Sequence, residues 1–427
     1  MGPKGSIYIR SANVTGMTKD AELMAKHINE LILEVGAADV VQVLTDNAAV
    51  MVAARSMLQE EYPHIIFGGC AAHVLDLLLE DIGKESWCKA IFAEARELVK
   101  FITSHEMCMA AYERAAKRLG VESPELLGEQ GAPLKLKKFG ETRFGTMVIL
   151  ADRLLKMKLV VQAAFDDEEY VSKVAPAWAA ANASAATIAT KASFWRKLEQ
   201  VTELLRPAYT LLRAFDGDTP CTGKVYYNMY ALGESLKNFR GAGVTTAVAK
   251  RAFDLFSKRW VMLHTEIHDA GFCLDPEFWS AEYAQDEDKR IKDGLMLCCE
   301  RILGSKEKAL NAFAQWITYR DEDGVFANEE AQEMARRIPA FKWWRTYGAM
   351  VPELQEVAMR VLAQPASSSA SERVNSEAGH IKSIKRSRMK TETMQQKLCI
   401  YHNLRFVDNV TAIDYEDSTF KWGEDED

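Results

Sequence analysis

Short apolar runs punctuate the first hundred residues. Positions 6–13 (SIYIRSAN) alternate between apolar and polar side chains, which is typical of a half-buried strand. Positions 39–44 (DVVQVL) form a nearly continuous Val-rich run, the pattern of a strand buried on both faces. A third run, IIF at 65–67, precedes a break at Gly68 and Gly69. These runs predict three strands.

Helical periodicity fills the intervals between the three runs. Apolar residues within 18–35 recur at helical spacing, with Thr18 as the expected N-cap and Gly36 as the expected stop. Further helices are expected over 48–61 and from Ala71 onwards. Strand and helix therefore alternate three times, which predicts a layered α/β unit.

The rest of the chain has the pattern of helices. Between 151 and 337 there is almost no strand signal, and 194–215 and 247–268 are long amphipathic segments. Residues 175–190 contain nine alanines and no charge. This composition fits a packed helix or a small-residue connector, and the pattern does not decide between them. Another helix is expected over 351–362. After it come a break, a Ser-rich turn and further helix.

Composition limits the class of protein. The 427 residues are 48% apolar and 27% charged, a globular balance, and no apolar run is long enough to cross a membrane. The net charge of −8 argues against a protein that coats nucleic acid through bulk positive charge. The eight cysteines contain no CxxC pair, which favours reduced thiols in a cytosolic or nuclear protein.

Two positions in the first block could carry chemistry. Asp46 follows a predicted buried strand, where open α/β sheets bind ligands, so it could hold Mg²⁺. Alternatively, Asp46 or Asn47 only caps the helix that follows. Cys70 and His73 are two metal-competent side chains at a helix start, but no second pair stands nearby to complete a zinc site.

Other candidates lie further along the chain. His264 and His268 are one helical turn apart, which suits a metal or an anion, and a helix-surface or core pair is the competing interpretation. Lys382, Lys385 and Arg386 share a helix face, which could be solvated, could pair with the acidic C-terminus, or could contact phosphate. No HExxH, Walker, GxGxxG or GxSxG motif is present, which removes those enzyme classes.

Together these segments resemble the hAT superfamily of DNA transposases, the Activator and hobo group. The resemblance begins with SANVTGMTKDAELMAKHINELILEVGAADVVQVLTDNAAVM and continues with YPHIIFGGCAAHVLDLLLEDI. FGETRF at 139–144, which contains Arg143, resembles a TRF element of the family. LRAFDGD at 212–218 and HDAGF at 268–272 also fit. The stretch 341–405, from FKWW to NLR, is similar throughout to the family's C-terminal dimerisation region.

The resemblance implies an RNase H-like core interrupted by a large helical insertion. It also implies phosphodiester cleavage and strand transfer by two divalent ions that three carboxylates hold. Carried onto this sequence, the second Asp is Asp46 and the Glu is Glu372, followed by Arg373. These two carboxylates are the implied metal ligands. Cys70 and His73 match the family's C-x-x-H element near the active site.

The sequence also departs from the family. The first catalytic Asp lies upstream of the segment with which this sequence begins, so the resemblance implies an N-terminally truncated protein with an incomplete core. Asp20 does not replace it, because Asp20 stands in the first turn of a predicted helix. The BED-type zinc finger is also missing. We therefore expect strand cleavage to be absent or very weak, Mg²⁺ or Mn²⁺ to be a cofactor only of a complete site, and DNA binding to be weak.

The resulting prediction is a hAT transposase-derived protein, catalytically inactive, that retains homodimerisation. The alternative is an active Mg²⁺-dependent DNA transposase of the DDE type whose N-terminus is missing from this sequence. A nuclear location is expected, with a cytoplasmic one as the alternative, and neither a membrane nor a small-molecule substrate is expected as a partner.

The expected domains follow the chain. They are a partial RNase H-like α/β unit over 1–150, an all-helical insertion over 151–337, the dimerisation region over 338–412 and an acidic disordered tail over 413–427. Apolar residues of the dimerisation region would sit between subunits or against the core. Those named for this role are Trp343, Trp344, Leu354, Val361 and Leu362.

Overall fold

The computed structural model describes residues 6–12, 14, 16–128, 131–137, 145–173, 178–217, 219–241, 245–279, 289–381 and 390–411. The chain forms two compact units. Unit 1 takes in Met1–Val74, Leu211–Ala231 and Trp260–Asp427, and unit 2 takes in Leu75–Thr210 and Leu232–Arg259. Each unit is therefore built from discontinuous stretches of sequence. The expected linear domain boundaries stay a prediction.

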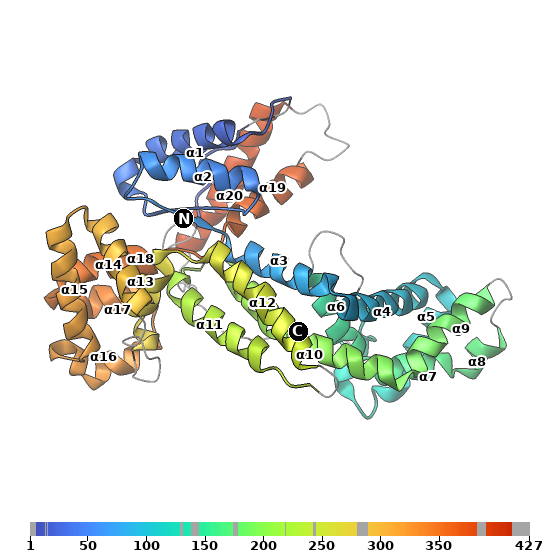
Figure 1. Ribbon diagram of the computed structural model, residues 1–427. Coiled ribbons are helices and arrows are strands. Elements are labelled where there is room, and N and C mark those ends of the chain that lie inside the picture. Colours follow the sequence, from blue (N-terminus) through green and yellow to red (C-terminus); the bar gives the residue numbers. More distant parts are fainter. Residues whose placement is uncertain are drawn as a thin grey trace. The chain divides into compact units, whose positions relative to one another are not determined.

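Most of the described chain is helical, with a small parallel sheet of two strands (Figure 1). The elements of unit 1 are α1 (Ala21–Val35), β1 (Gln42–Thr45), α2 (Ala49–Glu61), β2 (Ile66–Gly69), α13 (Glu266–Leu274), α14 (Lys289–Leu303), α15 (Lys306–Arg320), α16 (Glu329–Met334), α17 (Ala340–Tyr347), α18 (Pro352–Leu362), α19 (Ser369–Ile381) and α20 (Thr391–Thr411).

Unit 2 consists of helices, and some helices contribute residues to both units. Within unit 2 lie α4 (Ser86–Ser104), α5 (Glu106–Leu119), α6 (Gly145–Lys156), α7 (Lys158–Phe165), α8 (Glu168–Ser172) and α9 (Ala179–Thr190). Those that contribute to both are α3 (Ala71–Lys84), α10 (Ala192–Phe215), α11 (Thr222–Asn238) and α12 (Thr246–Leu263). No described helix is both long enough and apolar enough to cross a membrane.

The sheet lies between two layers of unit 1. β1 and β2 pair in parallel, with Val43 opposite Phe67 and Thr45 opposite Gly69. Val43 and Phe67 pack against the cluster that α1 and α2 form. Ile66, one position earlier in β2, belongs to the core of the helices α13 to α18. Because side chains alternate between the two faces of a strand, this short sheet contacts apolar residues on both sides.

The alternation of helix and strand expected for 18–84 is confirmed, with two corrections to its details. Asp20 caps α1 by accepting a hydrogen bond from Leu23 N at 2.9 Å, so the expectation that Thr18 caps it is wrong. Gly36 ends the helix at φ 96°, as expected. The expected break at Gly68 and Gly69 is also wrong, because both residues are part of β2.

The strand expected over 6–13 is absent from the described residues 6–12, which lie along α20 instead. Tyr8 N donates to Asn403 Oδ1, Asn403 Nδ2 donates to Tyr8 O, both at 2.9 Å, and Gln395 Nε2 donates to Ser11 O at 2.6 Å. Gln395 and Asn403 of α20 are eight residues apart, which is about 12 Å along the helix axis. Three extended residues span about 10 Å. The segment is therefore close to fully extended, and side-chain amides replace a neighbouring strand.

The core of unit 1 is aromatic and lies among α13 to α18. Trp343 and Trp344 are fully buried, and their indole nitrogens donate to Ala331 O at 2.7 Å and Leu274 O at 2.6 Å. The long helix expected over 247–268 is wrong in its extent, since α12 ends at Leu263. α13 begins after Thr265, which forms a capping box with His268.

Unit 2 is built around α4, α5, α7 and α9, which contact one another. The open question over 175–190 is answered for 179–190, which form α9, while residues 174–177 lie outside the described part of the chain. Ala185 and Ala189 are fully buried, and Trp195 Nε1 donates to Ala189 O at 2.7 Å. The small side chains therefore let α9 pack closely on its neighbours. All other described elements between 151 and 337 are helical too, as expected.

Candidate functional site

The candidate site lies at the carboxyl ends of the two strands. Because β1 and β2 are parallel, Asp46 and Cys70 emerge at the same edge of the sheet. Cys70 N donates to Thr45 O at 2.9 Å, which extends the strand pairing by one residue. The sheet thus places the residue expected to be the second catalytic Asp beside the start of the C-x-x-H element.

Cys70 joins this edge to a segment almost 300 residues later. Its side chain is fully buried, and its Sγ accepts hydrogen bonds from Ser368 N at 3.3 Å and His73 N at 3.4 Å. Ala71 N donates to Ala366 O at 2.9 Å. The thiol is therefore a structural acceptor that fastens the start of α3 to the chain just before α19.

The same segment is held from its other side by the start of α11. Thr222 Oγ1 donates to Gln364 O at 2.9 Å and to Pro365 O at 3.0 Å. Cys221 N and Thr222 N also donate to Gln364 O, each at 3.2 Å. Thr222 is fully buried. Its role was not predicted, because a lone Thr at the start of a helix carries no sequence signal for a partner 142 residues away.

Glu372 stands in the first turn of α19, directly after this fastened segment, and Arg373 follows it. Glu372 N donates to Ser368 O at 3.4 Å, and Arg373 Nη1 donates to Asp216 O at 3.3 Å. The serines 367–369 are all buried, which accounts for the small side chains there. The hydrogen bond from Ser368 N to Cys70 Sγ, together with the backbone bond from Cys70 N to Thr45 O, thus links the start of the Glu372 helix to the Asp46 end of the sheet.

Packing explains the two histidine candidates, His264 just before α13 and His268 within it. His264 Nε2 lies 2.7 Å from Asp269 Oδ1, and His268 Nδ1 accepts from Thr265 N at 3.0 Å. Burial, with the charge of His264 adding to it, lowers the pKa of His268 to about 3. His268 is therefore neutral at pH 7 and acts as a helix cap. This agrees with the core interpretation of the pair.

The residues named for dimerisation lie inside unit 1. Trp343, Trp344, Leu354 and Val361 are fully buried and Leu362 is 4% exposed, all within one core of the same chain. Of the two places expected for them, the structure favours the core. Arg143, Lys382, Lys385 and Arg386 lie outside the described residues.

Comparison with known families gives two matches. Residues 318–404 match the hAT family C-terminal dimerisation region. Residues 1–98 match a domain of unknown function, DUF659. This chain is an hAT transposase-related protein. A search of curated proteins found no significant match. The C-terminal match covers the end of α15, then α16, α17, α18, α19 and α20 as far as residue 404, so it takes in both aromatic core residues and the Glu372 helix.

The Asp46 end of this hAT-related protein can be compared with the needs of a divalent ion. Mg²⁺ takes several oxygen ligands in near-octahedral geometry. Asp46 is exposed, and its Oδ1 accepts from Ala48 N at 3.1 Å. The N-cap of α2 is Ala48, without a side-chain capping bond, so the interpretation of Asp46 or Asn47 as the cap is wrong. Among the described residues no three His, Cys, Asp or Glu side chains group as metal ligands.

The neighbours of Asp46 also suit a cation poorly. Asn47 is buried, and its Nδ2, a hydrogen-bond donor, has no partner within the described structure. Arg55 is buried beside it and donates from Nη2 to Asn47 Oδ1 at 3.2 Å. These donors and this positive charge do not fit a divalent metal ion. No reaction step through a metal follows from the described site.

Proposed function

We propose that this hAT transposase-related protein works as a homodimer held by its C-terminal region and does not cleave DNA strands by itself. The observation that carries the proposal is the match of 318–404 to a dimerisation region, within which α20 keeps apolar side chains exposed. For the fold, the proposal assigns part of an RNase H-like core to β1, β2, α1, α2 and α19. The helices between α3 and α19 then correspond to an insertion.

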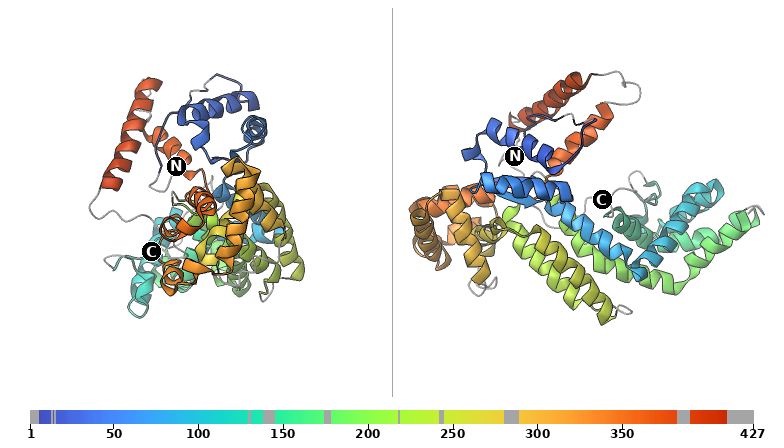
Figure 2. Two further views of the ribbon diagram at one scale, coloured as in Figure 1. Left: turned by 90° about the vertical axis from the view of Figure 1, so that its left-hand side faces the viewer. Right: turned by 45° about the horizontal axis from the view of Figure 1, so that its top comes forward.

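The surface proposed for self-association is the outer face of α20. α20 packs on α19 (Figure 2). Leu398 of α20 is 1% exposed and clusters with Val374 of α19. Ile400 and Leu404 are 59% and 55% exposed. They are one helical turn apart and therefore share a face. Exposed apolar side chains in register favour a helix partner, and the family match favours a second copy of the chain.

Size-exclusion chromatography with light scattering on the full chain tests this. We expect twice the chain mass of 47.9 kDa at micromolar concentration. The double variant Ile400→Lys and Leu404→Lys should give the single-chain mass. A matched control is Leu310→Lys with Ile317→Lys on α15, where the wild-type side chains are 54% and 48% exposed. The control should remain dimeric. A monomeric wild-type protein would refute the proposal.

The competing function is a Mg²⁺-dependent transposase, favoured by the bonds that link the Glu372 helix to the Asp46 end of the sheet. It predicts nicking of supercoiled plasmid in Mg²⁺ or Mn²⁺ that Asp46→Asn or Glu372→Gln abolishes. Our proposal predicts no nicking above that of the two variants.

A further inference from the structure

Arg55 is a charged side chain buried in the sheet layer of unit 1. It belongs to α2, and only 8% of its surface is exposed. Its Nη1 donates to Gly68 O, and its Nη2 donates to Asn47 Oδ1 at 3.2 Å. Gly68 is near the end of β2, and Asn47 follows β1 closely. The guanidinium therefore bridges the carboxyl ends of both strands.

The packing around this bridge leaves little free room. A Cβ atom added at Gly69 would lie 2.3 Å from Asn47 Oδ1, the atom that accepts from Arg55. A Cβ at Gly68 would lie 3.1 Å from Leu44 Cδ2. Close approach thus requires glycine at 69, whereas a side chain at 68 would need Leu44 to shift by a few tenths of an ångström. Both glycines leave the guanidinium seated against the strand ends.

Arg55 also senses the charge of Asp46. Burial lowers the pKa of the guanidinium, and the Asp46 carboxylate opposes that effect. A guanidinium keeps its proton in proteins, so Arg55 is a permanent positive charge at this edge. It is located where the family resemblance leads one to expect a metal ion beside Asp46.

A structural role alone does not account for a charge at this position. A neutral amide could donate to Gly68 O and Asn47 Oδ1 without the cost of removing a cation from water. The carboxylate of Asp46 offsets part of that cost. The hydrogen bonds explain why position 55 carries a donor, and Asp46 explains why the donor carries a positive charge.

We propose that Arg55 is a resident cation that occupies the electrostatic position of a divalent metal ion beside Asp46. Two positive groups at the carboxyl ends of the same two strands repel each other. Arg55 therefore disfavours binding of Mg²⁺ or Mn²⁺ at this edge and keeps Asp46 neutralised without one. The inference rests on the catalytic half of the proposed function and is independent of dimerisation.

The test is Mn²⁺ binding to the full chain, measured from the electron paramagnetic resonance signal of free Mn²⁺. Wild type, Arg55→Gln and Arg55→Lys are compared, each with and without Asp46→Asn. Arg55→Gln keeps an N–H donor and removes the charge, whereas Arg55→Lys is the matched control that keeps the charge. We expect Arg55→Gln to bind one additional Mn²⁺, at a site whose affinity in wild type is lower by about tenfold or more. Asp46→Asn should abolish that gain.

Wild type and Arg55→Lys should bind Mn²⁺ equally with and without Asp46→Asn. A wild-type site that Asp46→Asn removes would overturn the proposal, as would a folded Arg55→Gln that gains no site. Circular dichroism shows whether Arg55→Gln is folded. If Arg55→Gln is not folded, Mn²⁺ binding by wild type is compared with that of Asp46→Asn. Equal binding supports the proposal, and weaker binding by Asp46→Asn contradicts it. Plasmid nicking by wild type would refute the proposed inactivity instead, so the two failures are distinguishable.

Discussion

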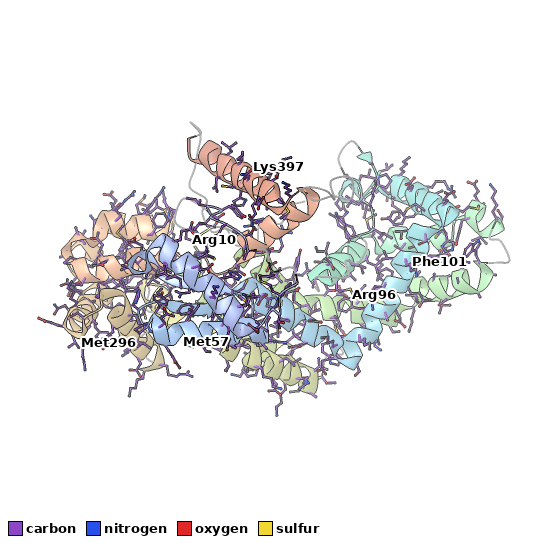
Figure 3. All side chains as sticks on the ribbon, turned by 90° about the horizontal axis from the view of Figure 1, so that it is seen from above. Arg10, Met57, Arg96, Phe101, Met296 and Lys397 are labelled. Carbon is purple, nitrogen blue, oxygen red and sulfur yellow. The ribbon has the colours of Figure 1, made fainter. Side chains whose placement is uncertain are left out.

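Two parts of the matched dimerisation region differ in what they offer to a partner. α17 and α18 bury their aromatic and aliphatic side chains in the core of unit 1, where Trp343 and Trp344 have no exposed surface. α20 keeps Ile400 and Leu404 more than half exposed and buries Leu398 against α19. Lys397 marks this helix in Figure 3. The most distinctive sequence of the region therefore stabilises the fold, while an inconspicuous helix presents the candidate contact surface.

The largest effect should come from Trp344→Ala. The indole is fully buried and donates to Leu274 O, so truncation leaves a cavity and an unpaired carbonyl. We expect a loss of about 3–5 kcal/mol in the free energy of unfolding. Denaturant unfolding followed by circular dichroism measures it. A loss below 1 kcal/mol would break the assignment of α17 to the core.

A smaller effect should follow from lowering the pH, through His268 in the same core. Burial lowers its folded pKa to about 3, so the unfolded chain binds the extra proton as pH falls through the ordinary histidine range. Stability is therefore lost as pH falls from about 6.5 towards 3, and the His268 share is about 2 kcal/mol at pH 5. His268→Asn keeps an acceptor for Thr265 N and should flatten this slope. Unfolding curves at pH 7 and 5 compare the two proteins, and equal slopes would contradict the expectation.

Thr222→Val should cost about 1–3 kcal/mol, since it removes the hydroxyl shared by Gln364 O and Pro365 O. Pro365 O then loses this donor, while Gln364 O keeps the backbone donors Cys221 N and Thr222 N. Thr222→Ser is the matched control and should retain most of the stability. Thermal unfolding of the full chain is the measurement. Equal melting temperatures for the Val and Ser variants would mean that these bonds do not hold the approach to α19.

The smallest effect on stability should come from Ile400→Ala on α20. An exposed side chain contributes little to folding, so the free energy of unfolding should change by no more than about 0.5 kcal/mol at concentrations low enough for the chain to be monomeric. Dilution series followed by light scattering should nevertheless show weaker self-association. A large loss of stability in the dilute protein would show that Ile400 belongs to the core, and the contrast with α17 would disappear.

Local periodicity predicted much of the sheet layer. β1, α2 and the start of α3 lie close to their expected positions, because strand and helix periods are written in neighbouring residues. In the segment 6–12 Tyr8 is buried, at 9% exposed, whereas Ile7 is 58% exposed, so the expected alternating burial holds only for Tyr8. Its partner was not predictable, since Asn403 and Gln395 lie almost 400 residues away and an alternating pattern does not say what covers its buried side.

The candidate site also contains residues that the sequence predicted and one that it did not. The resemblance named Asp46, Cys70 and Glu372, and the structure links their surroundings through Cys70 Sγ and Ser368 N. Arg55 was missed, because one Arg in an amphipathic helix has the pattern of a solvated surface residue. Met57 on the same helix is 46% exposed, and Figure 3 labels it. At these two positions of α2 the charged side chain is buried and the apolar one is exposed.

The sequence by itself determined the helices, the two strands and the relation to hAT transposases, because these depend on short periods and on motifs carried by contiguous residues. Tertiary structure alone decided which charges are buried and which apolar side chains are exposed. Burial is a property of what packs against a residue, and the partners of Arg55, Thr222 and Trp344 come from other elements of the fold. That is why the fold was largely readable in advance, whereas the resident cation beside Asp46 was not.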